Sequence, residues 1–130
     1  APPEVAGARR RLQPSWSVNA AAEAVGRALP VAREHLARVR EEVAAAKAEL
    51  VERLRRERFD VLAGAANFVL LRVGDAARFR ELLLDERVCV RDCRSFGLAQ
   101  WVRMSVPHRT AVDRTVWALV AARRQMEEER

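Results

Sequence analysis

Apolar residues recur at intervals of three and four positions across residues 32–58, and this spacing predicts a long amphipathic helix. The apolar stripe consists of Leu36, Val39, Val43, Ala46, Leu50 and Leu54. Acidic residues precede basic ones by four positions on the same stretch, as in Glu34–Arg38, which is the stabilising order. Such a helix extends roughly 40 Å, which is long for a small globular domain. We therefore expect it to bridge two bodies or to pack against another chain, with a coiled-coil dimer as the alternative.

The segment before this helix is interrupted by three prolines and a glycine, so we expect residues 1–17 to be irregular. Ser17 is expected to cap a short helix over residues 18–29. Pro30 then interrupts that helix, because proline lacks the backbone N–H that the helix needs.

After residue 58 the period of the pattern changes, and short strands alternate with helices. The expected strands are 59–62, 67–73, 88–90 and 101–106, and the expected helices are 76–85, capped by Asp75, and a last one from Arg109 onward. The stretch 67–73 is nearly continuous in apolar residues, which predicts a strand buried on both faces.

This order of elements predicts an α+β fold, namely a two-layer small domain. The long connecting helix is followed by a small, mainly antiparallel sheet with helices packed on one face. The other face of the sheet needs a cover, which we expect to lie in protein absent from this chain.

The composition agrees with one folded domain. The chain has 130 residues, of which 50% are hydrophobic and 32% charged, values typical of a globular protein. No apolar run approaches the roughly 20 residues that cross a bilayer, so no membrane partner is expected. The first residues lack the basic region and apolar core of a signal peptide. We therefore expect a cytoplasmic protein.

The formal net charge of +6 raises the question of nucleic-acid binding. Lys47 is the only lysine, however, and the arginines are interspersed with glutamates. This mixture favours a solvated surface on which arginines and glutamates form salt bridges, and no nucleic-acid partner is expected. A basic helical module that binds nucleic acid or an acidic partner remains the alternative function.

Residues that could carry out chemistry are few. Cys89 and Cys93 are four positions apart without a nearby histidine, so no metal site is expected and both should be buried free thiols. The sequence contains neither a glycine-rich phosphate loop nor the nucleophile elbow of a serine hydrolase. Lys47 lies in the middle of a helix, whereas a Schiff-base lysine needs a desolvated pocket with activating neighbours. We expect no catalytic residue in this chain.

Two arginines are candidates for binding an anion. Strand alternation places Arg103 on the same face as Trp101, opposite to Val102 and Met104. A guanidinium group is always charged, so on a partly buried face it must meet a carboxylate or a phosphate. The spacing leaves open whether Arg103 binds an anionic ligand with two parallel hydrogen bonds or makes a structural salt bridge. Arg91 could supply a second cation, although pairing with the adjacent Asp92 is the simpler interpretation.

Four segments occur in an order and spacing that resemble one enzyme family. They are residues 14–20 (PSWSVNA), 66–70 (ANFVL), 90–98 (VRDCRSFGL) and 101–106 (WVRMSV). Together they resemble the C-terminal third of the histidinol-phosphate aminotransferase and threonine-phosphate decarboxylase group. This group belongs to the fold-type I pyridoxal-phosphate enzymes, and the resemblance extends from Pro2 to about Ala122.

The resemblance implies roles that spacing alone does not give. It implies that Arg103 binds the α-carboxylate of the substrate and that Arg91 contacts the substrate or its phosphate. Residues 1–30 would form an interdomain segment with a short helix, with Trp16 and Asn19 near the domain junction. Residues 31–130 would form the C-terminal small domain, which the long helix connects to the large domain.

In this family pyridoxal 5'-phosphate is bound mainly by residues that precede the point where this chain begins. The resemblance therefore implies pyridoxal phosphate in the parent enzyme but none in this fragment, which would be inactive alone. Its partners would be the large pyridoxal-phosphate-binding domain and an amino-acid or amino-acid-phosphate substrate, in a homodimer. The reaction would be transamination, as of histidinol phosphate, or decarboxylation of threonine phosphate, in amino-acid or cobalamin biosynthesis.

Overall fold

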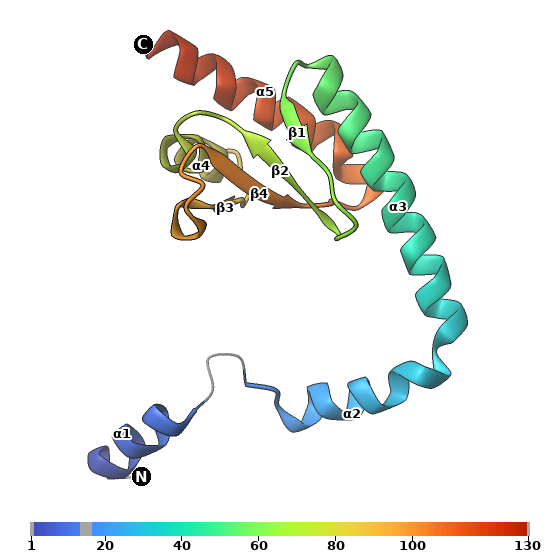
Figure 1. Cartoon of the computed structure of the whole chain (residues 1–130), viewed down its shortest axis with the longest axis vertical. Coiled ribbons are helices and arrows are strands. Elements are labelled where there is room, and N and C mark those ends of the chain that lie inside the picture. The colour runs from blue at the N-terminus through green and yellow to red at the C-terminus, as the bar shows by residue number, and fades with distance from the viewer. Residues whose placement is uncertain (1, 14–16, 130) are drawn as a thin grey trace. The chain divides into compact units, whose positions relative to one another are not determined.

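A computed structural model describes residues 2–13 and 17–129 of the chain (Figure 1). Its internal contacts separate two compact units, Ala1–Ala37 and Arg38–Arg130. The sheet and the buried core belong to the second unit. No helix in the described ranges is long and apolar enough to cross a membrane.

The first unit contains helix α1 (Pro3–Leu12), helix α2 (Ala20–Ala28) and the 3₁₀ turn η1 (Leu29–Val31). The expectation that residues 1–17 are irregular is therefore wrong. Pro3 stands in the first turn, where its missing N–H costs nothing, with Glu4 beside it and arginines in the last turn. These charges stabilise both ends of the helix macrodipole.

The start of α2 also differs from expectation. Asn19, rather than Ser17, is the N-cap, and its side chain accepts a hydrogen bond from the Ala22 N–H at 2.9 Å. The interruption at Pro30 is confirmed, because Pro30 lies in η1. Trp16, expected at the domain junction, lies outside the described residues.

Helix α3 (Arg33–Arg56) confirms the long helix expected over 32–58. Its buried residues are Ala46, Leu50, Val51 and Leu54, which belong to the C-terminal half of the helix. The helix ends where Arg58 adopts a left-handed backbone conformation with φ of 61°. The Phe59 N–H then bonds the Leu54 carbonyl at 2.9 Å, so the chain turns directly into the first strand.

Among the described residues, the sheet has four strands: β1 (Asp60–Leu62), β2 (Phe68–Arg72), β3 (Arg91–Asp92) and β4 (Trp101–Ser105). Their order is β1-β2-β4-β3, and each neighbouring pair is antiparallel. Helix α4 (Ala76–Asp85) follows β2, and helix α5 (Val112–Glu128) follows β4 (Figure 1). The 3₁₀ turns η2 (Arg94–Phe96) and η3 (Arg109–Ala111) complete the unit. The expected α+β two-layer fold is confirmed.

The core lies between one face of the sheet and helices α3, α4 and α5. Val69 and Leu71 from β2, with Val102 from β4, are fully buried against side chains of these helices. The helix contribution includes Leu54, Phe79, Leu83 and Leu119. Asp75 caps α4 as expected, accepting from the Ala77 and Arg78 N–H groups at 3.1 Å each.

Two strand expectations are wrong. Strand β2 is buried on one face only, because Phe68 and Leu70 remain partly exposed while their neighbours face the helices. The strand expected at 88–90 is instead the two-residue strand β3, Arg91–Asp92. The reason is local: the Val88 N–H bonds the Leu83 carbonyl at 2.8 Å and so completes the end of α4.

Candidate functional site

The face of the sheet that points away from the core carries the candidate site. We call it the open face, and it comprises Asp60, Leu62, Phe68, Leu70, Arg72, Arg91, Trp101, Arg103 and Ser105. One cross-strand row on it runs through all four strands, because Leu62 pairs with Leu70, Leu70 with Arg103, and Arg103 with Arg91. The row thus changes from apolar to cationic across the sheet.

The strand alternation expected around Arg103 is confirmed. Val102 and Met104 are buried in the core, and Arg103 is exposed on the open face. Its guanidinium carbon lies 5.1 Å from the centroid of the Phe68 ring. The sequence alone does not identify Phe68 as a neighbour of Arg103. The two residues are diagonal across β2 and β4, and their proximity can be recognised only when the register of these strands is known.

Arg91 is the register partner of Arg103, so the structure brings the two candidate residues to one place. The Nη2 of Arg91 donates to Ser95 Oγ at 3.3 Å, and the guanidinium carbon of Arg91 lies 5.8 Å from the centroid of the Phe96 ring. In the described part of the chain no carboxylate forms an ion pair with Arg91 or Arg103.

Asp92 does not neutralise this pair of cations. It is the register partner of Val102, which faces the core, and its carboxylate accepts from the Arg94 N–H at 2.8 Å. The nearest acid in sequence thus bonds the backbone of Arg94, the first residue of η2. Arg91 and Arg103 thus occupy opposing positions of β3 and β4 without a carboxylate partner in the described chain, which is an arrangement suited to binding an anion.

Cys93 lies beside the two arginines. Only 2% of it is exposed, and burial raises the pKa of its thiol, while the charges of Arg103 and Arg91 act in the opposite direction. Buried free thiols were expected at both cysteines, which is confirmed for Cys93 and wrong for Cys89, because Cys89 is exposed. Over residues 2–13 and 17–129, no group of three His, Cys, Asp or Glu residues could hold a metal ion.

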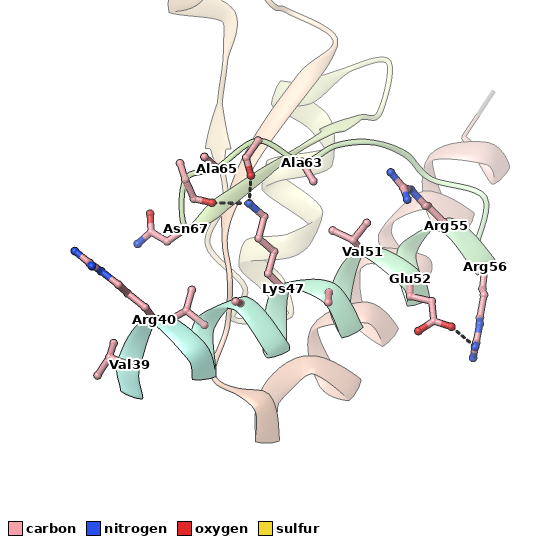
Figure 2. Close-up of a pocket in the computed structure, with 15 residues that line it drawn as sticks. Val39, Arg40, Lys47, Val51, Glu52, Arg55, Arg56, Ala63, Ala65 and Asn67 are labelled. Atoms are coloured by element: carbon pink, nitrogen blue, oxygen red, sulfur yellow. Dashed lines mark hydrogen bonds and ion pairs between the residues drawn. The ribbon is translucent and has the colours of Figure 1, made fainter. Parts of the chain in front are cut away.

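A separate groove of about 1250 Å³ lies between α3 and residues 63–67 (Figure 2). Lys47 extends from α3 across it, and its ammonium group donates to the carbonyls of Gly64 and Ala66, the latter at 2.6 Å. This lysine therefore fastens the loop before β2 to the helix. Its donors are directed at backbone oxygens and not into open space.

Comparison with known proteins decides the family. The family model described as aminotransferase class I and II matches residues 4–118, which is most of the chain. The chain belongs to this family. The resemblance found in the four sequence segments is thereby confirmed.

Aminotransferases of named organisms give the extent of the match. Histidinol-phosphate aminotransferase 1 of Cupriavidus pinatubonensis is 34% identical over 110 residues, which cover 82% of this chain and 29% of that protein. The histidinol-phosphate aminotransferase of Haloarcula marismortui is 31% identical over 118 residues, covering 91% of this chain and 32% of that protein. This chain therefore spans less than a third of the length of these two aminotransferases.

A solved structure agrees with the aminotransferase fold. The crystal structure of a putative aminotransferase from Burkholderia pseudomallei superposes with a TM-score of 0.66 and 28% sequence identity. The match covers 94% of this chain and 38% of the Burkholderia chain. The α+β fold of this chain therefore matches part of the aminotransferase fold.

Proposed function

We propose that this chain is the C-terminal substrate-clamping domain of a pyridoxal-phosphate-dependent aminotransferase-like enzyme. Arg103 binds the α-carboxylate of the substrate, and Arg91 binds a second anionic group such as a phosphate. The observation that supports this proposal is the placement of two guanidinium groups at opposing positions of β3 and β4, with no carboxylate paired to either in the described chain.

The physical argument rests on charge. Like charges directly opposite each other destabilise an antiparallel pair, so Arg91 and Arg103 are poorly suited to a purely structural role. An anion placed between them removes the repulsion and receives charge-assisted hydrogen bonds. Each guanidinium presents its donors as a planar fork that matches a carboxylate or a phosphate.

The open face also requires a partner. Leu62 is 53% exposed, and Phe68, Leu70 and Trp101 are only partly buried, because no described helix of the second unit covers them. We infer that the large domain of the same enzyme, in a homodimer, covers this face. Closure over the substrate then excludes water and strengthens both arginine contacts.

The domain assignment follows from the same proposal. Residues 31–130 form the small domain, residues 1–30 form the interdomain segment, and α3 (Arg33–Arg56) connects the small domain to the large one. We place the parent enzyme in the cytoplasm.

The residues of this chain do not fit the aldehyde of pyridoxal phosphate. That aldehyde needs a lysine amine free to bond it, whereas the only lysine, Lys47, has its ammonium group engaged by Gly64 and Ala66. When bound in the parent enzyme, the cofactor supplies an electron sink for the substrate. We therefore assign its binding to residues outside this chain, and we expect the chain alone to be inactive.

Two substrates suit a site with two cations. Histidinol phosphate carries a phosphate, and the 2-oxo acid that exchanges the amino group with it carries a carboxylate. Threonine phosphate carries both groups on one molecule. The similarity to two histidinol-phosphate aminotransferases favours transamination of histidinol phosphate, and hence a role in amino-acid biosynthesis.

The test begins with the native gene, sequenced upstream of the codon for Ala1. We expect an in-frame extension that encodes a Schiff-base lysine.

The complete protein is then assayed for transamination of histidinol phosphate and for decarboxylation of threonine phosphate. Arg103→Gln should lower kcat/KM by about 100-fold or more, because two charge-assisted hydrogen bonds are lost. Arg124→Gln, on the exposed side of α5, is the matched control and should leave kcat/KM unchanged.

Two results would reject the proposal. One is a start codon at Ala1 with no lysine-bearing extension. The other is an Arg103→Gln enzyme that turns over substrate as fast as the wild type.

A further inference from the structure

Phe68 lies at the beginning of β2, on the open face, beside Arg103. The register pairs Phe68 with Ser105 and Leu70 with Arg103, so Phe68 and Arg103 are diagonal neighbours across two strands. The distance from the guanidinium carbon of Arg103 to the Phe68 ring centroid is 5.1 Å, within the range of a cation–π interaction.

The sheet order places Phe68 and Arg91 on opposite sides of Arg103. Strand β4 lies between β2, which carries Phe68, and β3, which carries Arg91. The Phe68 ring attracts the guanidinium from one side, while the Arg91 charge repels it from the other. Both forces direct the Arg103 side chain toward β2, so together they reduce the number of conformations it samples.

An aromatic ring restrains an arginine in a way that a carboxylate does not. A carboxylate partner would use the N–H donors of Arg103 and so compete with an anionic ligand. The face of a ring attracts the cation without accepting those N–H groups in conventional hydrogen bonds. Arg103 can therefore be held in place before the ligand arrives and keep its donors for the ligand.

The backbone on which Phe68 stands is itself anchored on two sides. Lys47 binds the carbonyls of Gly64 and Ala66 in the loop that precedes Phe68. The adjacent Asn67 carbonyl accepts from the Val106 N–H at 3.0 Å. The ring is thus carried on a segment fastened to both α3 and the end of β4.

We propose that Phe68 is a positioning residue, which preorganises the Arg103 guanidinium for anion binding. The assignment rests on the proposed function in one respect, namely that Arg103 is an anion-binding residue. Phe68 itself touches no substrate in this proposal and acts through Arg103.

The test uses the chain as it is and the NMR signals of the arginine side chains. In the wild type the Arg103 Nε–Hε and Cδ–Hδ signals should be displaced by the ring current of Phe68 and show restricted fast motion. Phe68→Leu should return these signals toward the values of a free arginine, and Phe68→Tyr should retain the wild-type values. Leu62→Ala, which removes apolar surface from the same face on β1, is the control and should leave the Arg103 signals unchanged.

A titration with inorganic phosphate, followed by the same signals, separates this inference from the proposed function. Phe68→Leu should weaken phosphate binding at Arg103 by about three- to tenfold, and Phe68→Tyr should remain within about twofold. Equal affinities for the wild type and Phe68→Leu would overturn the positioning role and leave the proposed clamp intact.

The opposite failure is also recognisable. If phosphate perturbs no arginine signal in any variant, anion binding by the clamp is contradicted. The ring-current signature still decides whether Phe68 holds Arg103. A wild-type Arg103 signal equal to that of Phe68→Leu overturns the inference directly.

Discussion

Arg91 and Arg103 occupy directly opposing positions in the antiparallel β3–β4 pair and present two guanidinium groups on one face of the sheet. Cross-strand pairs of opposite charge stabilise a sheet, whereas like charges at this position destabilise it. The described chain offers no carboxylate to either guanidinium. We therefore expect the pair to lower the stability of the isolated chain, and the proposed binding of an anion would explain why the pair is present.

This relationship predicts a measurable repulsion between the two side chains. A double-mutant cycle with Arg91→Gln, Arg103→Gln and the double variant should give an unfavourable coupling of about 0.2–1 kcal/mol in the free energy of unfolding at low salt. The coupling should shrink at high ionic strength, because exposed charges are screened. Urea denaturation of the four proteins measures it. A favourable coupling would mean that a shared acidic partner bridges the arginines, and it would contradict the anion-binding interpretation.

A second prediction concerns the fastening of the loop before β2. Lys47→Met should lower the free energy of unfolding by about 1–2 kcal/mol, because the carbonyls of Gly64 and Ala66 lose a charged donor. Arg56→Met removes an exposed ion pair with Glu52 on the same helix and should cost less than about 0.5 kcal/mol. Chemical denaturation compares the two variants. Equal losses would show that the Lys47 contacts are no stronger than an ordinary surface pair.

The two cysteines should differ in reactivity. Cys89 is exposed, whereas Cys93 is 2% exposed and burial raises the pKa of its thiol, so Cys93 supplies little thiolate at neutral pH. Iodoacetamide followed by mass spectrometry should modify Cys89 quickly and Cys93 only when the chain unfolds. Cys89→Ser should abolish the fast phase. Rapid modification of folded Cys89→Ser protein would contradict the burial of Cys93.

The raised pKa of Cys93 also fixes the sign of a pH effect. The unfolded chain loses the thiol proton at a lower pH than the folded chain, so the folded state binds more protons in that range. The free energy of unfolding should therefore fall as pH rises from the ordinary thiol pKa toward the raised one. Cys93→Ala should reduce this dependence, which denaturation at several alkaline pH values would detect.

The sequence predicted those features that depend on local patterns. The face alternation of Val102, Arg103 and Met104 follows from the period of a strand, and the cap at Asp75 follows from a short polar side chain before an apolar helix. The position of Arg103 on the open face could thus be predicted without knowledge of the tertiary structure.

The remaining features depend on contacts between distant segments, which a local pattern does not contain. The apolar run predicts that β2 is buried on both faces, but its apolar outer side chains, including Phe68, have no cover among the described residues of the second unit. Arg91 lies opposite Arg103 because of the register between β3 and β4, which the sequence does not contain. The strand predicted at 88–90 is wrong because the Val88 N–H bonds the Leu83 carbonyl at the end of α4 and is not available to the sheet.

The last helix offers a final test through pH. Arg78 on α4 holds Glu129, beyond the end of α5, with two hydrogen bonds of 3.0 and 2.5 Å, and these bonds lower the pKa of the Glu129 carboxyl. A carboxyl whose pKa is lowered on folding stabilises the protein above its unfolded pKa, and the contribution is lost as pH falls through the folded pKa. The free energy of unfolding of the wild type should therefore fall more steeply below the ordinary glutamate range than that of Glu129→Gln. Glu128→Gln removes a neighbouring charge without breaking this contact and should follow the wild-type curve. Parallel acid limbs for the wild type and Glu129→Gln would show that the Arg78 contact does not persist in solution.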